Sequence, residues 1–282
     1  MFLMNWIIRL YFFSFILLSV NCEEKQIEPS DENWSFVVFG DLRQGFGVYK
    51  KLVLYMSSIT PQPELAFCIG DILKREGNTV EWLNFWRHSK PLTDIMPLHI
   101  ARGNHEGNSD AAEKIYKEQT AISDSNFYYS FIHKNCAFLI LDSYEKEHEG
   151  TFGDTQMSWL TSTLKYFENS VHIEYIFLFF HHPLFPQGKH RNEKFGNAEK
   201  VHTTFQSHKK IKAVFVGHDH MYNKFTKDNI VYITTGGAGA SLYKGHGGDY
   251  HHFVKVTFYE ESSRINIKTI GIFNEIVENF DL

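Results

Sequence analysis

Residues 175–183 read Tyr-Ile-Phe-Leu-Phe-Phe-His-His-Pro, and this stretch decides the fold because it joins two patterns. The first is an unbroken apolar run, which is typical of a strand covered on both faces of its sheet. The second is the abrupt change to two histidines and a proline. The stretch therefore predicts a buried strand that presents imidazole side chains at its carboxyl end.

Similar short apolar runs alternate with helical patterns along the rest of the chain. Further strands are expected at residues 34–39, 65–69, 97–101, 127–132, 137–141, 213–216, 230–234, 253–258 and 265–270. Helices are expected within residues 48–58, 80–88 and 155–167, the last with Thr155 as its N-cap. Because strands outnumber helices, the sequence predicts a layered α/β domain.

Polar loops follow the expected strands at five places. They read Gly40-Asp41-Leu42-Arg43, Gly70-Asp71, Gly103-Asn104-His105-Glu106, His181-His182-Pro183 and Gly217-His218-Asp219-His220. In α/β sheets, ligands bind beyond the carboxyl ends of strands, where side chains from several loops converge. Carboxylates with neutral imidazoles suit Mn²⁺, Fe or Zn²⁺, whereas Ca²⁺ prefers oxygen ligands alone. Each fragment alone is a common turn, but their occurrence together indicates a metal centre.

These loops resemble the motifs of the calcineurin-like metallophosphoesterase superfamily, which read Asp-x-His, Gly-Asp, Gly-Asn-His-Glu/Asp, His and Gly-His-x-His. The resemblance covers residues 34–240, and four of the five motifs match. It implies a metallophosphoesterase domain over residues 34–282, built as a four-layer α-β-β-α sandwich with two mixed β-sheets flanked by helices. The glycine-rich residues 236–240 also resemble a loop of extracytoplasmic members, although a flexible turn explains them equally well.

The resemblance also implies two metal ions, of Mn, Fe or Zn, and a ligand set for each. The ligands implied for the first ion are Asp41, Asp71 and His220. Those implied for the second are Asp71, which would bridge the two ions, Asn104, His181 and His218. His181 is preferred over its neighbour His182 because the family ligand stands two residues before the proline. His182 would then support the ligands from outside the set.

The reaction that the resemblance implies is hydrolysis of phosphate esters. Two cations about 3.5–4 Å apart lower the pKa of a bridging water, and the resulting hydroxide attacks phosphorus in line. His105 would protonate the leaving alkoxide. Glu106 either orients His105 or pairs with a charge elsewhere. The motifs leave open whether the substrate is a phosphomonoester or a diester, such as a cyclic nucleotide or a lipid head group.

The sequence departs from the family pattern at Arg43, where most members have a metal-binding histidine. A guanidinium stays protonated and offers no lone pair, so it cannot ligate a metal. Arg43 is expected to bind a substrate phosphate bidentately. The alternative is that its charge weakens the first site and leaves a one-metal or poorly active protein. A lipoprotein that keeps the fold but works by binding is a further alternative.

The amino-terminal residues 1–21 are expected to be a signal peptide of the lipoprotein type. The apolar run Leu10–Val20 fits a signal-peptide core of roughly 7–15 residues and is short of the ~20 needed to span a bilayer. Residues 18–22 resemble a lipobox that would lipidate Cys22, although Asn21 departs from it. An uncleaved anchor and plain secretion are the alternatives. With residues 22–33 as a tether, the domain would be anchored outside the cytoplasm, as in bacterial lipoproteins.

Composition excludes several other classes of protein. The chain has 282 residues, 43% of them hydrophobic, and a net charge of -5. These values exclude a disordered or collagen-like chain. The sequence has no long basic run of the kind that predicts binding to nucleic acid. No feature predicts an oligomeric state. Cys68 and Cys136 lie in apolar runs and are expected to be buried thiols, with a disulfide as the alternative in an oxidising compartment.

Overall fold

The computed structural model of this protein describes residues 33–122 and 126–282. The expected signal peptide, the expected lipidation site Cys22 and all but the last residue of the expected tether lie outside the described residues. Within the described part of the chain, no helix combines the length and the apolar character that crossing a membrane requires.

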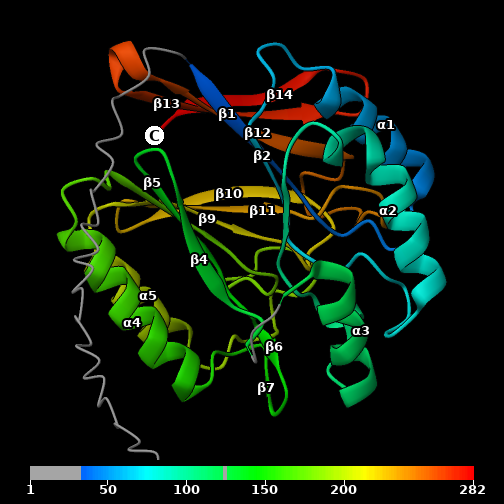
Figure 1. The fold of residues 1–282 in the computed structure, drawn as a ribbon, viewed down its shortest axis with the longest axis horizontal. Helices are drawn as coiled ribbons and strands as arrows, with labels where there is room; N and C mark the ends of the chain where they lie inside the picture. Colours follow the sequence, from blue (N-terminus) through cyan, green and yellow to red (C-terminus); the bar gives the residue numbers. More distant parts are fainter. Residues whose placement is uncertain (1–32, 123–125) are drawn as a thin grey trace, which may run out of the picture.

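Two six-stranded sheets form the centre of the domain (Figure 1). The first has the order β14-β13-β12-β1-β2-β3. Its strands are β1 (Trp34–Phe39), β2 (Leu65–Cys68), β3 (Leu98–Ile100), β12 (His252–Tyr259), β13 (Arg264–Gly271) and β14 (Ile276–Asp281). Here β1, β2 and β3 run parallel, while β12 pairs antiparallel with β1, so the sheet is mixed.

The second sheet has the order β10-β11-β9-β8-β5-β4. Its strands are β4 (Tyr129–His133), β5 (Cys136–Ile140), β8 (Tyr175–Phe179), β9 (Ile211–Val216), β10 (Tyr222–Lys227) and β11 (Ile230–Thr235). The four inner strands run parallel, and the edge strands β4 and β10 pair antiparallel. A separate two-stranded ribbon joins β6 (Tyr144–Glu145) to β7 (His148–Glu149).

Helices cover the outer faces of both sheets, which gives four layers (Figure 1). The helices are α1 (Phe46–Ser57), α2 (Thr79–Thr93), α3 (Asp110–Thr120), α4 (Asp154–Asn169) and α5 (Ala198–Gln206), with 3₁₀ turns η1 (Asn104–Glu106) and η2 (Glu260–Ser262). Side chains of α1 and α2 pack on the first sheet, and those of α4 and α5 pack on the second. The predicted four-layer α-β-β-α sandwich is therefore confirmed.

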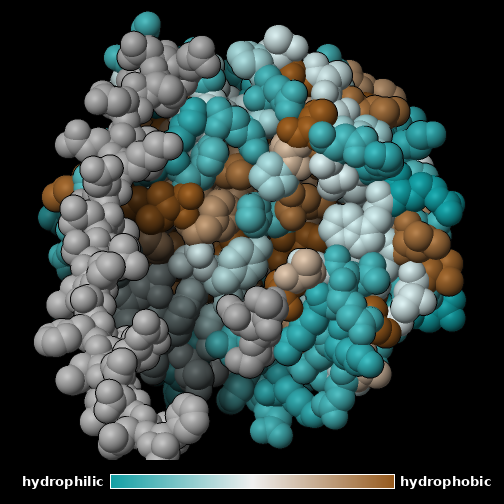
Figure 2. Space-filling view, viewed as in Figure 1, coloured by the Kyte–Doolittle hydropathy of each residue, from teal (hydrophilic) through white to brown (hydrophobic). Residues whose placement is uncertain are grey.

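Apolar side chains fill the space between the sheets. Phe36 and Val38 of β1 face the second sheet, whereas Val37 and Phe39 face α1. Because neither face of β1 contacts water, its sequence is apolar apart from the buried Ser35. Phe67 of β2 stacks on Phe179 of β8 with ring centroids 4.0 Å apart, which joins the two sheets directly. In the same view, Figure 2 shows brown apolar surface in the middle of this face, bordered mostly by teal hydrophilic residues.

Several elements differ from the sequence prediction. The N-cap of α4 is Gly153 rather than Thr155, and the N–H of Gly153 donates to a carboxylate oxygen of Glu145 at 3.0 Å. The apolar stripe of this helix is buried as its spacing predicts. Helices α3 and α5 and the edge strands β10 and β14 were not predicted. Each is short and buries few side chains, so its sequence contains only a few apolar residues.

The fold brings the carboxyl ends of strands from both sheets together. The backbone N–H of His218, after β9, donates to Asp41 Oδ1, after β1, at 3.0 Å. Nδ1 of His181, after β8, lies 2.9 Å from the carbonyl oxygen of Ile69, after β2. Loops separated by more than 100 residues therefore share one site between the two sheets.

Candidate metal centre

Sharp turns direct the polar side chains into this site. Asp41, Asp71 and His218 have φ angles of 60°, 53° and 68°, in the left-handed region that non-glycine residues seldom occupy. Such strain is typical of functional sites, where surrounding contacts hold it. The glycine before His218 is required by close approach, because a Cβ on Gly217 would lie 2.4 Å from Asp41 Oδ2.

Four side chains from the two sheets converge at the centre. Asn104 Oδ1 lies 3.1 Å from His181 Nε2 and 3.1 Å from His218 Nδ1. His181 Nε2 also lies 3.3 Å from Asp71 Oδ1. Atoms that share one cation at bond lengths of about 2.0–2.2 Å lie roughly 3 Å from one another. These four atoms are therefore spaced like the ligands of a single ion.

Hydrogen bonds fix the tautomers of the two histidines. Nδ1 of His181 lies 2.9 Å from a carbonyl oxygen, and Nε2 of His218 lies 3.2 Å from Glu193 Oε2. A ring nitrogen that donates its hydrogen leaves a lone pair on the other nitrogen. Burial lowers the pKa of both His181 and His218 below the ordinary value, which keeps the rings neutral. Their lone pairs therefore face Asn104 and Asp71 in the form that binds metals.

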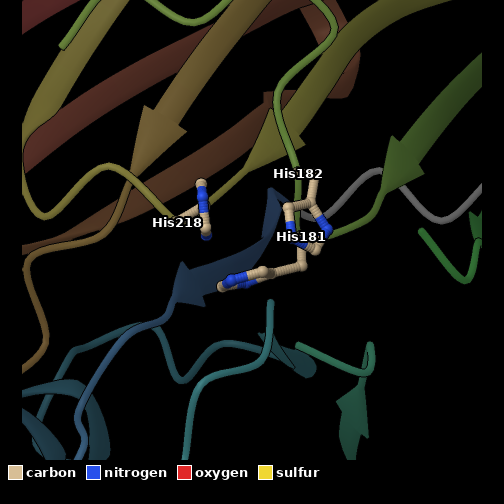
Figure 3. A group of neighbouring side chains, drawn as sticks. All are labelled: His181, His182 and His218. Carbon is tan, nitrogen blue, oxygen red and sulfur yellow. The ribbon is translucent and has the colours of Figure 1, made fainter. Parts of the chain in front are cut away.

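His182 lies beside this group. Figure 3 shows His181 and His182 at the end of β8 and His218 facing them from the loop after β9. One nitrogen from each of the three rings lies within 4.8 Å of the others, so all three could approach one ion. His182 Nδ1 is, however, 2.9 Å from Ser143 Oγ, which also accepts the His182 backbone N–H at 3.0 Å. These contacts favour the supporting role expected for His182.

The buried carboxylates need a positive charge nearby. Asp41 is fully buried, and among the described residues its Oδ2 has no hydrogen-bond partner. Burial, followed by repulsion from Asp71, raises the pKa of Asp41 well above its ordinary value. Ligand atoms of Asp41, Asp71 and His181 lie within 4.8 Å of one another. A cation here would satisfy the unpartnered oxygen and offset the repulsion.

Glu106 supports the loop that carries Asp71. Its carboxylate accepts backbone N–H groups at 2.8–3.2 Å from Asp71, Ile72, Leu73 and Gly103. Burial, followed by the charge of Asp71, raises the pKa of Glu106 to about 8. No described hydrogen bond joins Glu106 to the ring of His105. Of the two roles expected for Glu106, the contacts therefore do not support orientation of His105.

His105 lies at the rim of the centre and is half-buried. Its Nδ1 is 3.0 Å from the carbonyl oxygen of Lys74, so this nitrogen donates a hydrogen bond. Its Nε2 lies 3.9 Å from Asp71 Oδ2, and its backbone N–H donates to Asp71 Oδ1 at 3.0 Å. The ring therefore presents Nε2 to the centre, where it can donate or accept a proton.

Arg43 and His220 lie next to each other, and His220 also lies near Asp41. Arg43 Nη1 is 3.5 Å from His220 Nε2, and His220 Nε2 is 3.7 Å from Asp41 Oδ1. Nδ1 of His220 lies 2.8 Å from the carbonyl oxygen of Ser241, and burial lowers the pKa of His220 to about 4. The neutral ring thus directs its lone pair toward Arg43. The guanidinium therefore lies beside the imidazole expected to bind the first ion, in a side chain that is partly exposed.

Three residues of the site were missed by the sequence analysis. Glu193 accepts from His218, its other oxygen lies 2.6 Å from His190 Nδ1, and His190 Nε2 lies 3.3 Å from Tyr243 Oη. These residues belong to long polar loops without hydrophobic periodicity. The loop of His190 is held in place by Asp219, whose carboxylate accepts its backbone N–H at 3.0 Å. No sequence pattern marks such a tertiary contact.

Comparisons with known proteins agree with this geometry. Purple acid phosphatase 23 of Arabidopsis thaliana is 28% identical over 182 residues, which make up 58% of this chain and 39% of that protein. A Fibrobacter succinogenes protein named "Probable cyclic nucleotide phosphodiesterase" is 29% identical over 143 residues, 49% of this chain and 52% of its own. The chain thus spans about half of these relatives or less.

A solved structure shares the fold. That of purple acid phosphatase PPD1 from yellow lupin matches with a TM-score of 0.72 and 17% identity, over 89% of this chain and 54% of that one. The family model described as calcineurin-like phosphoesterase matches residues 35–222, from β1 to the start of β10. The matched segment includes all five loops that meet at the centre. The chain therefore belongs to the calcineurin-like phosphoesterase family.

Proposed function

We propose that this protein is a metal-dependent hydrolase of phosphate esters. The observation that carries the proposal is the spacing of Asp71, Asn104, His181 and His218, whose four ligand atoms form contacts of 3.1–3.3 Å. Their mixed oxygen and nitrogen donors suit Mn, Fe or Zn. A bound ion would supply Lewis acidity, which lowers the pKa of water from 15.7 to about 7 and provides a nucleophile at neutral pH.

His105 is the proposed proton donor to the leaving group. Its Nδ1 hydrogen is held by the carbonyl oxygen of Lys74, so a proton on Nε2 is directed toward the centre. Protonation of the departing alkoxide removes the need to expel a strongly basic anion. Because the ring is half-buried at the rim, it can regain its proton from solvent after each turnover.

Arg43 is the proposed contact to the substrate phosphate. Its Nη1 is directed to His220, and the remaining N–H groups of a guanidinium can bind phosphate oxygens. These donors would offset the negative charge that accumulates in the transition state. The same contact serves a phosphomonoester or a diester, so both substrate classes enter the test. The name of the Fibrobacter relative makes a cyclic nucleotide one diester to include.

The direct test is turnover of p-nitrophenyl phosphate and of its bis ester by the purified protein with added Mn²⁺, Fe²⁺ or Zn²⁺. We expect metal-dependent release of p-nitrophenol, and His105→Ala should lower kcat by about 10²–10⁴-fold. An exposed histidine on another surface provides the control, and His172→Ala should retain full activity. Hydrolysis of the bis ester alone would identify a diesterase. Failure with both esters and every metal would overturn the proposal in favour of a binding lipoprotein.

A further inference from the structure

We infer that the guanidinium of Arg43 takes the place of the first metal ion, so that this protein holds one ion where the family pattern implies two. The inference rests on the proposed function, because it concerns the number of ions at the same centre. A relative with a complete first site could lose that ion to a chelator. The guanidinium of Arg43 is part of the chain and cannot be exchanged or chelated.

The lone pair of His220 is already engaged. Nδ1 of His220 donates to the carbonyl oxygen of Ser241 at 2.8 Å, so the lone pair is on Nε2. This is the atom that the Gly-His-x-His motif would offer to a first ion. Arg43 Nη1 lies 3.5 Å from it. A guanidinium has only N–H donors, so it can face this lone pair as a donor. An ion at this position would have to displace the guanidinium.

The ligand atoms expected for the first site also do not form one cluster. Among the described residues, ligand atoms of Asp41, Asp71 and His181 form one cluster within 4.8 Å of one another, and His218 belongs to two other clusters. His220 belongs to none of those clusters. Asp41 and Asp71 lie within 4.8 Å of His181, whereas His220, whose Nε2 is 3.7 Å from Asp41 Oδ1, completes no such cluster with the two carboxylates. The three ligands expected for the first ion, Asp41, Asp71 and His220, are therefore not gathered into one cluster.

The backbone keeps Arg43 at the centre. Its N–H donates to the carbonyl oxygen of Asp71 at 3.1 Å, and its φ angle is 36°. Tyr243 stacks on His220 with ring centroids 4.3 Å apart and an interplanar angle of 16°. The backbone hydrogen bond thus holds Arg43 in place, and the stacked ring of Tyr243 holds His220. A second cation entering here would meet the guanidinium charge at close range, which disfavours its binding.

A fixed guanidinium can still serve the reaction. It supplies a permanent positive charge beside Asp41 and leaves N–H donors for phosphate oxygens. It cannot polarise water as a metal does, so the nucleophile would depend on the single ion held by Asp71, Asn104, His181 and His218. The two consequences that were expected as alternatives for Arg43 are therefore compatible with one another.

The test counts ions in the full chain. The protein is loaded with Mn²⁺, excess metal is removed by gel filtration, and manganese per chain is measured by inductively coupled plasma mass spectrometry. Electron paramagnetic resonance of the same sample distinguishes an isolated Mn²⁺ from an exchange-coupled pair. We expect one ion per chain with an isolated-ion spectrum. Arg43→His should bind two ions with a coupled spectrum, which is a doubling of the stoichiometry.

Two further variants make the outcome decisive. Arg87→His adds a histidine on the exposed side of α2 and should remain at one ion. His220→Ala should also keep one ion, since His220 holds none in the parent. Two coupled ions in the parent, a fall in stoichiometry in His220→Ala or no gain in a folded Arg43→His would each overturn the inference while leaving the proposed function in place. Binding of no ion at all would overturn both.

Discussion

Single residues set the shape of the metal centre, and Glu106 does so without facing the site. Its carboxylate is the shared acceptor for the backbone N–H groups of Asp71, Ile72, Leu73 and Gly103. Both oxygens are used, and the group is buried. The left-handed turn at Asp71 is therefore stabilised by a side chain from a different loop. The position of Asp71, an expected metal ligand, therefore depends on a residue that is not itself an expected ligand.

Replacement of Glu106 tests this support. Glu106→Gln leaves one oxygen and directs an NH₂ group at the same backbone donors. We expect the free energy of unfolding to fall by about 1–3 kcal/mol, the usual cost of unsatisfied buried polar groups. Urea denaturation checks the loss, and Mn²⁺ titration should show weaker binding. Glu118→Gln on the exposed side of α3 is the control. Equal stability of the two variants would contradict the supporting role.

The residues at the centre differ in how well they could be predicted from the sequence. Asp41, Asp71 and His218 could be named because each directly follows a buried strand within a short motif. Glu193 and Tyr243 could not, because their positions depend on contacts such as that between His190 and the carboxylate of Asp219. The role of Arg43 was expected only as alternatives, since its contact with His220 spans 177 positions.

At the scale of elements, strand β3 carries a histidine inside the apolar layer. His99 stacks on Phe131 with centroids 4.1 Å apart, and its Nδ1 lies 3.1 Å from Tyr129 Oη. Burial, followed by the nearby His133, lowers the pKa of His99 to about 4 from its ordinary 6.5. The unfolded chain therefore binds a proton on this ring at a higher pH than the folded chain does.

This difference makes stability depend on pH between about 6.5 and 4. As the pH falls through that window, the unfolded state gains a proton that folded His99 does not take up, so the free energy of unfolding decreases. His99→Phe keeps the aromatic stack and removes the titration. We expect a shallower decrease for His99→Phe in urea denaturation at pH 6.5, 5.5 and 4.5. The exposed variant His172→Asn should follow the parent; matching curves for His99→Phe would refute the assignment.

Elements also differ in how well the sequence predicts them. Strands such as β1, β2 and β8 could be predicted because both of their faces are buried and their sequences are almost entirely apolar. Helix α3 could not, since it buries only Ala112 and Tyr116 and most of its other residues are polar. Edge strand β10 alternates buried and exposed positions too weakly to be distinguished from a loop.

At the scale of the whole molecule, a buried ion pair joins the two sheets. Arg102 follows β3 of the first sheet, and Asp142 follows β5 of the second. Arg102 Nη2 lies 2.5 Å from Asp142 Oδ2, and both side chains are fully buried. Arg102 also lies over the ring of Phe127 at 4.0 Å from its centroid. Arg102 Nη1 also lies 2.9 Å from Glu113 Oε1. Removing Arg102 would leave the carboxylate of Asp142 buried without its cation.

Arg102→Ala should therefore lower the free energy of unfolding by about 3–5 kcal/mol. The double variant Arg102→Met with Asp142→Leu removes both charges and fills similar volume, so it should recover most of that loss. Denaturation in urea measures all of these variants. A loss below about 1 kcal/mol for Arg102→Ala, as for exposed ion pairs, would contradict the proposed contribution.

The division of the site between two sheets has a consequence for the lifetime of the folded chain. Asp71 and Asn104 come from the first sheet, and His181 and His218 come from the second. An ion bound by all four residues would link the two sheets, because only the assembled sheets can bind it. Free metal at 100 times its Kd would add about 2.7 kcal/mol to the stability of the native state. Scarcity of metal in the surroundings would then shorten the survival of the protein as well as slow its reaction.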